Sequence, residues 1–163
     1  MPTLQWCSER GVVSSEIEAK VLSRKAKAVV TFKGHPMVRS AHPTTLEVTT
    51  EDHLTSRGDC IVGVGASMGC AQLDAQLKEG LRRRGSRVTI RMLVGPYAFE
   101  VKAAGDPRLE LSHPRDIVIR KSDYVSDRTL AVHADAAARD IPREMVRQLR
   151  DPGNVGRLEI EVT

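Results

Sequence analysis

The residues best suited to acid–base or metal chemistry are two histidines, His42 and His113, each followed by proline. An imidazole changes its charge near neutral pH and readily binds metal ions. If the two rings meet in the fold, Asp59 and Asp116 join them as candidate catalytic residues in a polar pocket, with Asp59 as a general base or as the partner of a histidine. Alternatively, each histidine caps a turn that its proline makes rigid, and Asp59 binds the backbone N–H groups of the preceding turn.

Residues 119–123, Ile-Arg-Lys-Ser-Asp, have the composition of an anion-binding segment. Arg120 and Lys121 supply positive charge and Ser122 supplies a hydroxyl group, a combination that suits a phosphate. A matching segment 71 positions earlier, 48–52, keeps only the aspartate. A feature present in one copy is not required by the fold, and this favours a binding role. A solvated strand end with surface salt bridges is the alternative.

Four arginines recur at helical spacing near the carboxyl end of the chain, namely Arg139, Arg143, Arg147 and Arg150. On one face of a helix they would span roughly 16 Å. Like charges four residues apart repel each other, so an acidic partner would relieve them, and a nucleic-acid backbone is such a partner. The alternative is the solvated face of an amphipathic helix, partly offset by Asp140 and Glu144.

The remaining motifs predict neither a cofactor nor a metal site. Residues 63–69 place three glycines between a strand and a helix, but their spacing differs by one from the dinucleotide-binding pattern. No acidic residue ends the following strand, so backbone flexibility explains these glycines better. The three cysteines are odd in number and lack metal-ligand spacing, which predicts reduced thiols.

The elements that must position these residues occur twice. A shift of 71 positions places Gly34, Pro36, His42, Pro43, Asp52 and Arg57 on Gly105, Pro107, His113, Pro114, Asp123 and Arg128. Further along, a shift of 68 positions pairs Ala66, Leu73, Leu77, Leu81 and Arg82 with Ala134, Ile141, Met145, Leu149 and Arg150. A self-match at a fixed offset indicates a duplicated structural unit.

Hydrophobic periodicity gives each unit the order β-β-β-α-β. The first unit has predicted strands at 28–32, 44–49, 60–64 and 88–92 and a helix at 71–83. The second has strands at 97–103, 116–121, 129–133 and 158–162, and a helix with Asp140 as its cap and Pro142 in its first turn.

Two such units would hide each other's open sheet edges. We therefore predict an α+β fold, a pseudo-two-fold β-barrel of the swapped or double-psi type capped by the two helices, with an open two-layer sandwich as the alternative. Residues 26–163 form the single domain, with repeats at 26–94 and 95–163. Residues 1–25 are an N-terminal appendage containing a short predicted helix at 16–25.

Composition limits the classes of function. The chain has 163 residues, 25 Lys and Arg against 21 Asp and Glu, a net charge of +4 and a pI near 9.2. This charge permits an anionic partner. No apolar stretch approaches the ~20 residues of a membrane helix, and no secretory signal is visible, so no membrane partner is expected. The chain has only one Trp, two Tyr and two Phe, so it offers few aromatic side chains on which nucleic-acid bases could stack.

Several segments resemble an archaeal family labelled domain of unknown function 371. They are residues 33–35, 42–49, 54–64, 113–124 and 134–140, and the resemblance covers about residues 28–162. The Gly58-Asp59-Cys60 motif and the segment from His113 to Asp123 are its most distinctive parts. The resemblance implies an archaeal source and hence a cytoplasmic location. It implies no activity.

Three functions follow from these observations. The leading one is a binding module for an anionic partner such as structured RNA or a ribonucleoprotein. The alternative is a small-molecule enzyme or a phosphorylated-metabolite binder whose pocket combines His42, Asp59, His113, Asp116, Arg120 and Lys121. The third is an assembly protein that uses residues 1–25 as a docking arm. The sequence assigns neither a reaction nor an oligomeric state.

Overall fold

The computed structural model describes residues 26–55 and 57–163. Its strands are β1 (Ala26–Lys33), β2 (Thr45–Thr49), β3 (Ile61–Gly63), β4 (Arg87–Val94), β5 (Tyr97–Ala104), β6 (Asp116–Arg120), β7 (Thr129–Ala131) and β8 (Val155–Val162). Its helices are η1 (Cys70–Gln72), α2 (Ala75–Arg82), η2 (Ala138–Asp140) and α3 (Arg143–Leu149), where η denotes a 3₁₀ turn. The predicted appendage at 1–25 and its helix lie outside the described residues.

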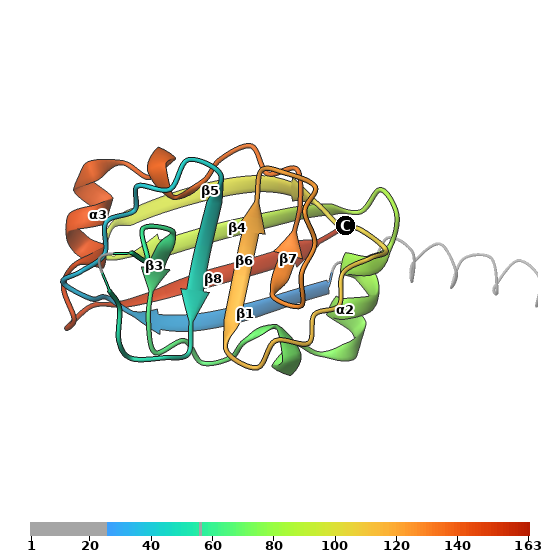
Figure 1. Ribbon diagram of the computed structural model, residues 1–163, viewed down its shortest axis with the longest axis horizontal. Coiled ribbons are helices and arrows are strands. Elements are labelled where there is room, and N and C mark those ends of the chain that lie inside the picture. Colours follow the sequence, from blue (N-terminus) through green and yellow to red (C-terminus); the bar gives the residue numbers. More distant parts are fainter. Residues whose placement is uncertain (1–25, 56) are drawn as a thin grey trace, which may run out of the picture.

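The strands form two four-stranded sheets. One is antiparallel, in the order β1-β8-β4-β5, and the other has the order β3-β2-β6-β7. In the second sheet β2 and β6 are antiparallel, while β3 and β7 run parallel to their neighbours. Figure 1 shows β2 and β6 crossing in front of the long strands at a steep angle, with α2 and α3 at opposite ends of the molecule. The predicted mixed α+β class is confirmed.

The two sheets differ in how their outer faces are covered. The burial of β4 and β8 alternates from residue to residue, which is the pattern of a strand with one solvated face. In β6, by contrast, Ile117, Val118 and Ile119 are all buried, and Leu46, Glu47 and Val48 of β2 are buried too. Continuous burial means that the outer face of this sheet is also covered, and the buried position of Glu47 matters below.

The predicted helices are shorter than their sequence patterns. The helix predicted at 71–83 begins only at Ala75, because the Asp74 carboxylate accepts a hydrogen bond from Leu77 N at 2.7 Å and caps it there. The prediction that Asp140 caps the second helix is wrong. The Asp140 carboxylate accepts from Ala137 N at 2.8 Å and closes η2, while Pro142 is the N-cap of α3.

The elements recur at the offsets that the sequence predicts. Strands β1 and β2 recur as β5 and β6 after 71 positions (26 to 97 and 45 to 116), and β3, α2 and β4 recur as β7, α3 and β8 after 68 (61 to 129, 75 to 143 and 87 to 155). The strands of the two units are also exchanged, since β1 pairs with β8 and β5 with β4.

One predicted residue pairing is wrong. Glu47 N donates to the Cys60 carbonyl at 2.9 Å, and its counterpart Val118 N donates to the Arg128 carbonyl at 2.9 Å. Arg128 therefore corresponds to Cys60 and not to Arg57. The change from 71 to 68 falls in the loop before β3, where the first copy has three more residues.

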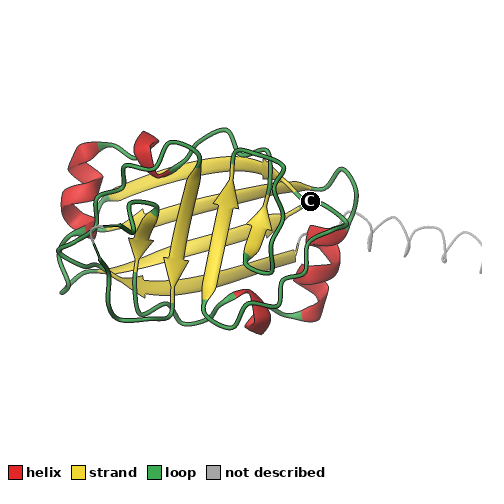
Figure 2. Ribbon diagram, in the orientation of Figure 1, coloured by secondary structure: helices red, strands yellow, loops and turns green. Residues whose placement is uncertain are grey.

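The predicted closed barrel is not confirmed. Figure 2 shows the strands of one sheet crossing those of the other. Among the described residues, the two sheets meet at their edges through single bridges, Lys33 to Val64 and Ala104 to Val132, and no continuous ladder joins them. With three residues each, β3 and β7 are too short to form one. Side chains satisfy other edge groups instead, since Thr31 N donates to Ser67 Oγ and Lys102 N to Asp135 Oδ1. The fold is nearer to the alternative of two layered sheets.

The helices of the described ranges are too short to cross a membrane, since α2 has 8 residues and α3 has 7.

Candidate anion-binding site

The two histidines cap equivalent turns and do not meet. His42 Nδ1 accepts hydrogen bonds from Thr44 N and Thr45 N at 3.2 and 3.1 Å. His113 Nδ1 accepts from the N–H groups of residues 115 and 116 at 3.1 and 2.9 Å. The first residues of β2 and β6 lie at opposite ends of an antiparallel pair, so the two turns are separated by the length of that ribbon. A shared catalytic centre of both imidazoles is therefore ruled out.

The two candidate aspartates also lie at different ends of this ribbon and make different contacts. The Asp59 backbone carbonyl accepts hydrogen bonds from Ala41 N at 3.0 Å and His42 N at 3.2 Å, so this residue holds the turn through its main chain. The Asp116 carboxylate lies at the other end of the ribbon. There it accepts from the Thr49 hydroxyl at 2.8 Å and pairs with Arg128 at 3.2 Å.

A shallow pocket of about 400 Å³ lies on the outer face of the β2–β6 pair. It is lined by His42, Thr44, Thr45, Glu47, Cys60, Val118, Arg120, Ser122, Tyr124 and Arg128, and is called the His42–Arg120 pocket below. Of the predicted site residues it brings together His42, Arg120 and Ser122. Asp59, His113, Asp116 and Lys121 do not line it, so the predicted six-residue pocket does not form as one site.

Arg120 is half-buried at this pocket, and its contacts are with neutral groups. It donates to the Thr129 hydroxyl at 2.9 Å and to the Ser126 hydroxyl at 3.3 Å, and it lies 4.9 Å from the centre of the Tyr124 ring. Among residues 26–55 and 57–163, no ion pair includes Arg120. Burial, together with the nearby Arg128 charge, lowers the pKa of this guanidinium. An anion in the pocket would compensate that charge.

The sequence analysis did not predict a polar cluster in the pocket lining, formed by Glu47, Cys60 and Arg128. Glu47 is only 6 % exposed, accepts a hydrogen bond from Cys60 Sγ at 3.3 Å and lies 3.6 Å from Arg128. Burial raises the pKa of Glu47, and the neighbouring Asp116 raises it further. Burial and the Glu47 charge raise the pKa of Cys60 to about 12, so this thiol is not an activated nucleophile. One sequence signal pointed here: Glu47 matches Val118, the centre of a fully apolar strand.

Two of the four arginines predicted to bind an anion along one helix already donate hydrogen bonds to backbone carbonyl groups. Arg143 donates to the carbonyls of Arg39 and Ser40 at 3.0 and 2.7 Å, and Arg150 donates to that of Val38 at 2.9 Å. Both side chains therefore brace a loop. Arg139 lies in η2 and not on α3, so the predicted stripe along one helix is wrong. The side chains of Arg139 and Arg147 are exposed.

Two predicted residues at the end of β6 have partners of their own. Lys121 Nζ pairs with the Asp140 carboxylate at 3.3 Å, and its backbone N–H donates to the Thr44 carbonyl at 2.9 Å. The exposed Ser122 hydroxyl accepts from Tyr124 N at 3.3 Å and faces the pocket. Lys121 thus borders the pocket, and Ser122 belongs to it.

The glycines of residues 63–69 have packing roles. A Cβ atom at Gly63 would overlap the Phe32 ring, and Gly65 has a φ of +55°, which favours glycine. Among the described residues, no group of three His, Cys, Asp or Glu side chains is arranged to hold a metal ion.

Comparison with known sequences supports one family. The family model described as "Domain of unknown function (DUF371)" matches residues 30–163. A relative in the archaeon Methanocaldococcus jannaschii, "Uncharacterized protein MJ0206", is 38% identical over 123 residues, which cover 76% of this chain and 90% of the relative. The match includes both His-Pro turns, the Gly58-Asp59-Cys60 segment and the whole of the two sheets apart from the first residues of β1. The chain therefore belongs to the DUF371 family.

Proposed function

We propose that the protein is a binding module for structured RNA, whose phosphates lie against the surface around η2, α3 and the end of β6. The observation that carries this proposal is a set of cations that one copy of a duplicated position has and the other copy lacks. The cations Arg39, Arg120, Lys121, Arg139, Arg143 and Arg147 occupy positions whose counterparts are Glu110, Thr49, Thr50, Ala71, Ala75 and Glu79. The fold does not need these cations, because the other repeat adopts the same structure without them.

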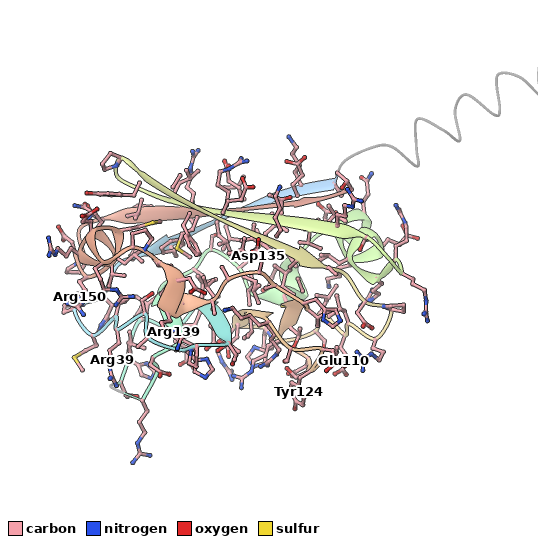
Figure 3. All side chains as sticks on the ribbon, turned by 90° about the horizontal axis from the view of Figure 1, so that it is seen from above. Arg39, Glu110, Tyr124, Asp135, Arg139 and Arg150 are labelled. Atoms are coloured by element: carbon pink, nitrogen blue, oxygen red, sulfur yellow. The ribbon has the colours of Figure 1, made fainter. Side chains whose placement is uncertain are left out.

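The six cations, called the basic end below, belong to adjoining segments. Arg143 is hydrogen-bonded to the carbonyl of Arg39, Arg139 N donates to the His42 carbonyl, and Lys121 N donates to the Thr44 carbonyl. In Figure 3, Arg39 and Arg139 gather at one end of the molecule and Glu110 lies toward the other. The surface therefore runs from α3 to the His42–Arg120 pocket without an intervening element.

An RNA backbone fits this charge better than a single small ligand does. Exposed guanidinium groups spread along a surface match the regular spacing of phosphates, and binding of this kind releases counterions. Asp140 and Glu144 lie within the same surface, and Asp140 is already paired with Lys121. Tyr124 is 61% exposed beside Arg120 and is available to stack on one unpaired base.

A salt series tests this proposal. We expect the fluorescence anisotropy of a labelled RNA hairpin to report binding that weakens steeply as KCl rises. In the double variant Arg139→Ala/Arg147→Glu, which installs the residues of the first repeat, the slope of log affinity against log salt should fall by about 1 per lost phosphate contact. The matched control is Arg83→Ala/Arg84→Glu, which makes the same change of charge at two exposed arginines beside α2.

The control should bind RNA as the wild type does. Absence of binding, binding that does not respond to salt, or equal losses in the two double variants would contradict the proposal.

A further inference from the structure

Because the chain is duplicated, the His42–Arg120 pocket can be compared with the equivalent site at the other end of the β2–β6 pair. At the opposite end of the β2–β6 pair, the Asp116 carboxylate accepts from the Thr49 hydroxyl, pairs with Arg128 and lies 3.7 Å from His113 Nε2. That end therefore contains an anion of its own, surrounded by a histidine, a hydroxyl and a guanidinium.

The equivalent end has lost the anion and has its cation at a different position. Thr45 stands where the other end has Asp116, Arg120 stands where it has Thr49, and Cys60 stands where it has Arg128. A histidine and a guanidinium suited to surround a carboxylate are thus present at both ends, but no residue at this end corresponds to the Asp116 carboxylate.

The tautomer of His42 makes it a hydrogen-bond donor. Because Nδ1 accepts from two backbone N–H groups, the neutral ring carries its proton on Nε2. His113 is held in the same way, and its Nε2 faces the Asp116 carboxylate. No described residue provides such a carboxylate for His42 Nε2, since Thr45 replaces it and lies against Nδ1 at 2.8 Å.

We propose that the His42–Arg120 pocket binds the oxyanion of a small ligand, a phosphate or carboxylate group, between His42 Nε2 and the Arg120 guanidinium. The oxyanion takes the place that the Asp116 carboxylate fills at the other end. Ser122 and Tyr124 line the same pocket and contact the rest of the ligand. Glu47, the acid in the pocket lining, is engaged by Arg128 and by the Cys60 thiol. This inference does not depend on RNA binding.

Two substitutions, one that places a carboxylate in the pocket and one that removes its arginine, test the proposal. The variant Thr45→Asp supplies the missing carboxylate, and Arg120→Thr restores the residue of the other end. We expect titration of the ¹⁵N-labelled protein with inorganic phosphate to give saturable NMR shifts at Thr44, Ser122 and Tyr124. Both variants should weaken this binding about tenfold or more, as loss of a charge-assisted hydrogen bond does.

Two controls separate the pocket from general charge effects. Thr31→Asp adds the same charge on the exposed face of β1, and Arg83→Ala removes an exposed arginine beside α2, outside both the pocket lining and the basic end. Both should bind phosphate as the wild type does. Non-saturable shifts in the wild type, or unchanged binding in a folded Thr45→Asp variant, would overturn the proposal. If Thr45→Asp fails to fold, Arg120→Thr and its partial rescue by Arg120→Lys decide the same question.

Competition experiments identify the source of the oxyanion. Acetate tests a carboxylate, a nucleoside monophosphate tests a free phosphate ester, and 5′-phosphorylated and 5′-hydroxyl forms of one short RNA test a terminal phosphate. Displacement of phosphate by any of these supports the pocket and names its ligand class. Displacement by none of them contradicts it. Loss of RNA binding in Arg139→Ala/Arg147→Glu with phosphate binding intact would show that the two proposals succeed or fail separately.

Discussion

Buried Glu47 and half-buried Cys60 form a hydrogen-bonded pair in the lining of the His42–Arg120 pocket. The thiol donates to the carboxylate at 3.3 Å, and the carboxylate is also 3.6 Å from Arg128. Removing a carboxylate from water disfavours its ionised form, which is why burial raises the pKa of Glu47. The same burial, with an acid beside it, keeps Cys60 protonated. At this scale the cluster keeps the Cys60 thiol protonated and is not suited to nucleophilic chemistry.

We predict that Cys60 is nearly inert to thiol reagents. A pKa of about 12 in place of 9.0 lowers the thiolate fraction at pH 8 roughly a thousandfold. In a Cys7→Ser/Cys70→Ala background, its rate with a chromogenic disulfide should be lower than that of glutathione by about this factor. Glu47→Gln removes the adjacent charge and should raise the rate several-fold, whereas Glu51→Gln on the surface should not. A wild-type rate equal to that of glutathione would refute the prediction.

At the scale of elements, equivalent buried positions of the two repeats are filled by side chains of different sizes. Phe32 on β1 is fully buried against two glycines, Gly63 on β3 and Gly156 on β8, at which a Cβ atom would overlap the ring. The counterparts in the other repeat are Ala103, Ala131 and Val88, so an alanine replaces the phenylalanine and an alanine and a valine replace the two glycines. Interiors are close-packed, so a large side chain on one strand requires small ones on its neighbours.

We predict that these positions are energetically coupled. Phe32→Ala should lower the free energy of unfolding by about 3–5 kcal/mol through the cavity it leaves. Gly63→Ala should cost about 1–3 kcal/mol through overpacking. The double variant should cost less than the sum, because the added methyl group fills part of the cavity. Urea denaturation measures all three, and Phe32→Ala/Gly85→Ala, at a site with no neighbour in contact, should be additive. Strict additivity at Phe32 and Gly63 would contradict the coupling.

At the scale of the whole molecule, the two repeats depend on each other. The pairs β1–β8, β4–β5, β4–β8 and β2–β6 all join one repeat to the other, and only β2–β3 and β6–β7 lie within a repeat. A single repeat would therefore leave long strands with unpaired edges and an uncovered apolar face.

We predict that fragments 26–94 and 95–163 do not fold as isolated monomers and do fold when mixed. Circular dichroism and size-exclusion chromatography should show unfolded or self-associated material for each fragment alone and a 1:1 complex for the mixture. The cut lies in the turn between β4 and β5, so it breaks no strand. A monomeric, cooperatively folded fragment 26–94 would contradict this expectation.

Local patterns in the sequence were sufficient for the elements. The continuous apolar run at 60–64 and the pattern at 116–121, with Ile117 and Ile119 on one face, predicted strands within a few residues of their observed bounds, because side-chain burial follows strand geometry directly. The turn role of the two histidines was also among the predicted alternatives. The predicted start of α2 was wrong because Leu77 N donates a hydrogen bond to the Asp74 carboxylate, and this cap outweighs the helical periodicity of the sequence.

The candidate site was predicted only in part. Arg120 and Ser122 stood out because the matching segment of the other repeat, 48–52, has neither residue, and both line the pocket. Glu47 and Arg128 were missed, since their contact joins residues 81 positions apart (47 to 128) and depends on which loop covers the sheet. The carbonyl contacts of Arg143 and Arg150 were also missed, because a sequence does not show that a guanidinium is bonded to carbonyl groups of a distant loop.

By itself, then, the sequence determined the duplication, the order of the elements and the positions where the two copies diverge, since these are properties of residue identity and spacing along one chain. Only the tertiary structure decided that the histidines stand at opposite ends of a ribbon, that the sheets meet at single bridges, and that the Arg120 guanidinium donates to the hydroxyl groups of Thr129 and Ser126. Those outcomes depend on strand direction and on loops that bring distant residues together, and neither is encoded by local periodicity.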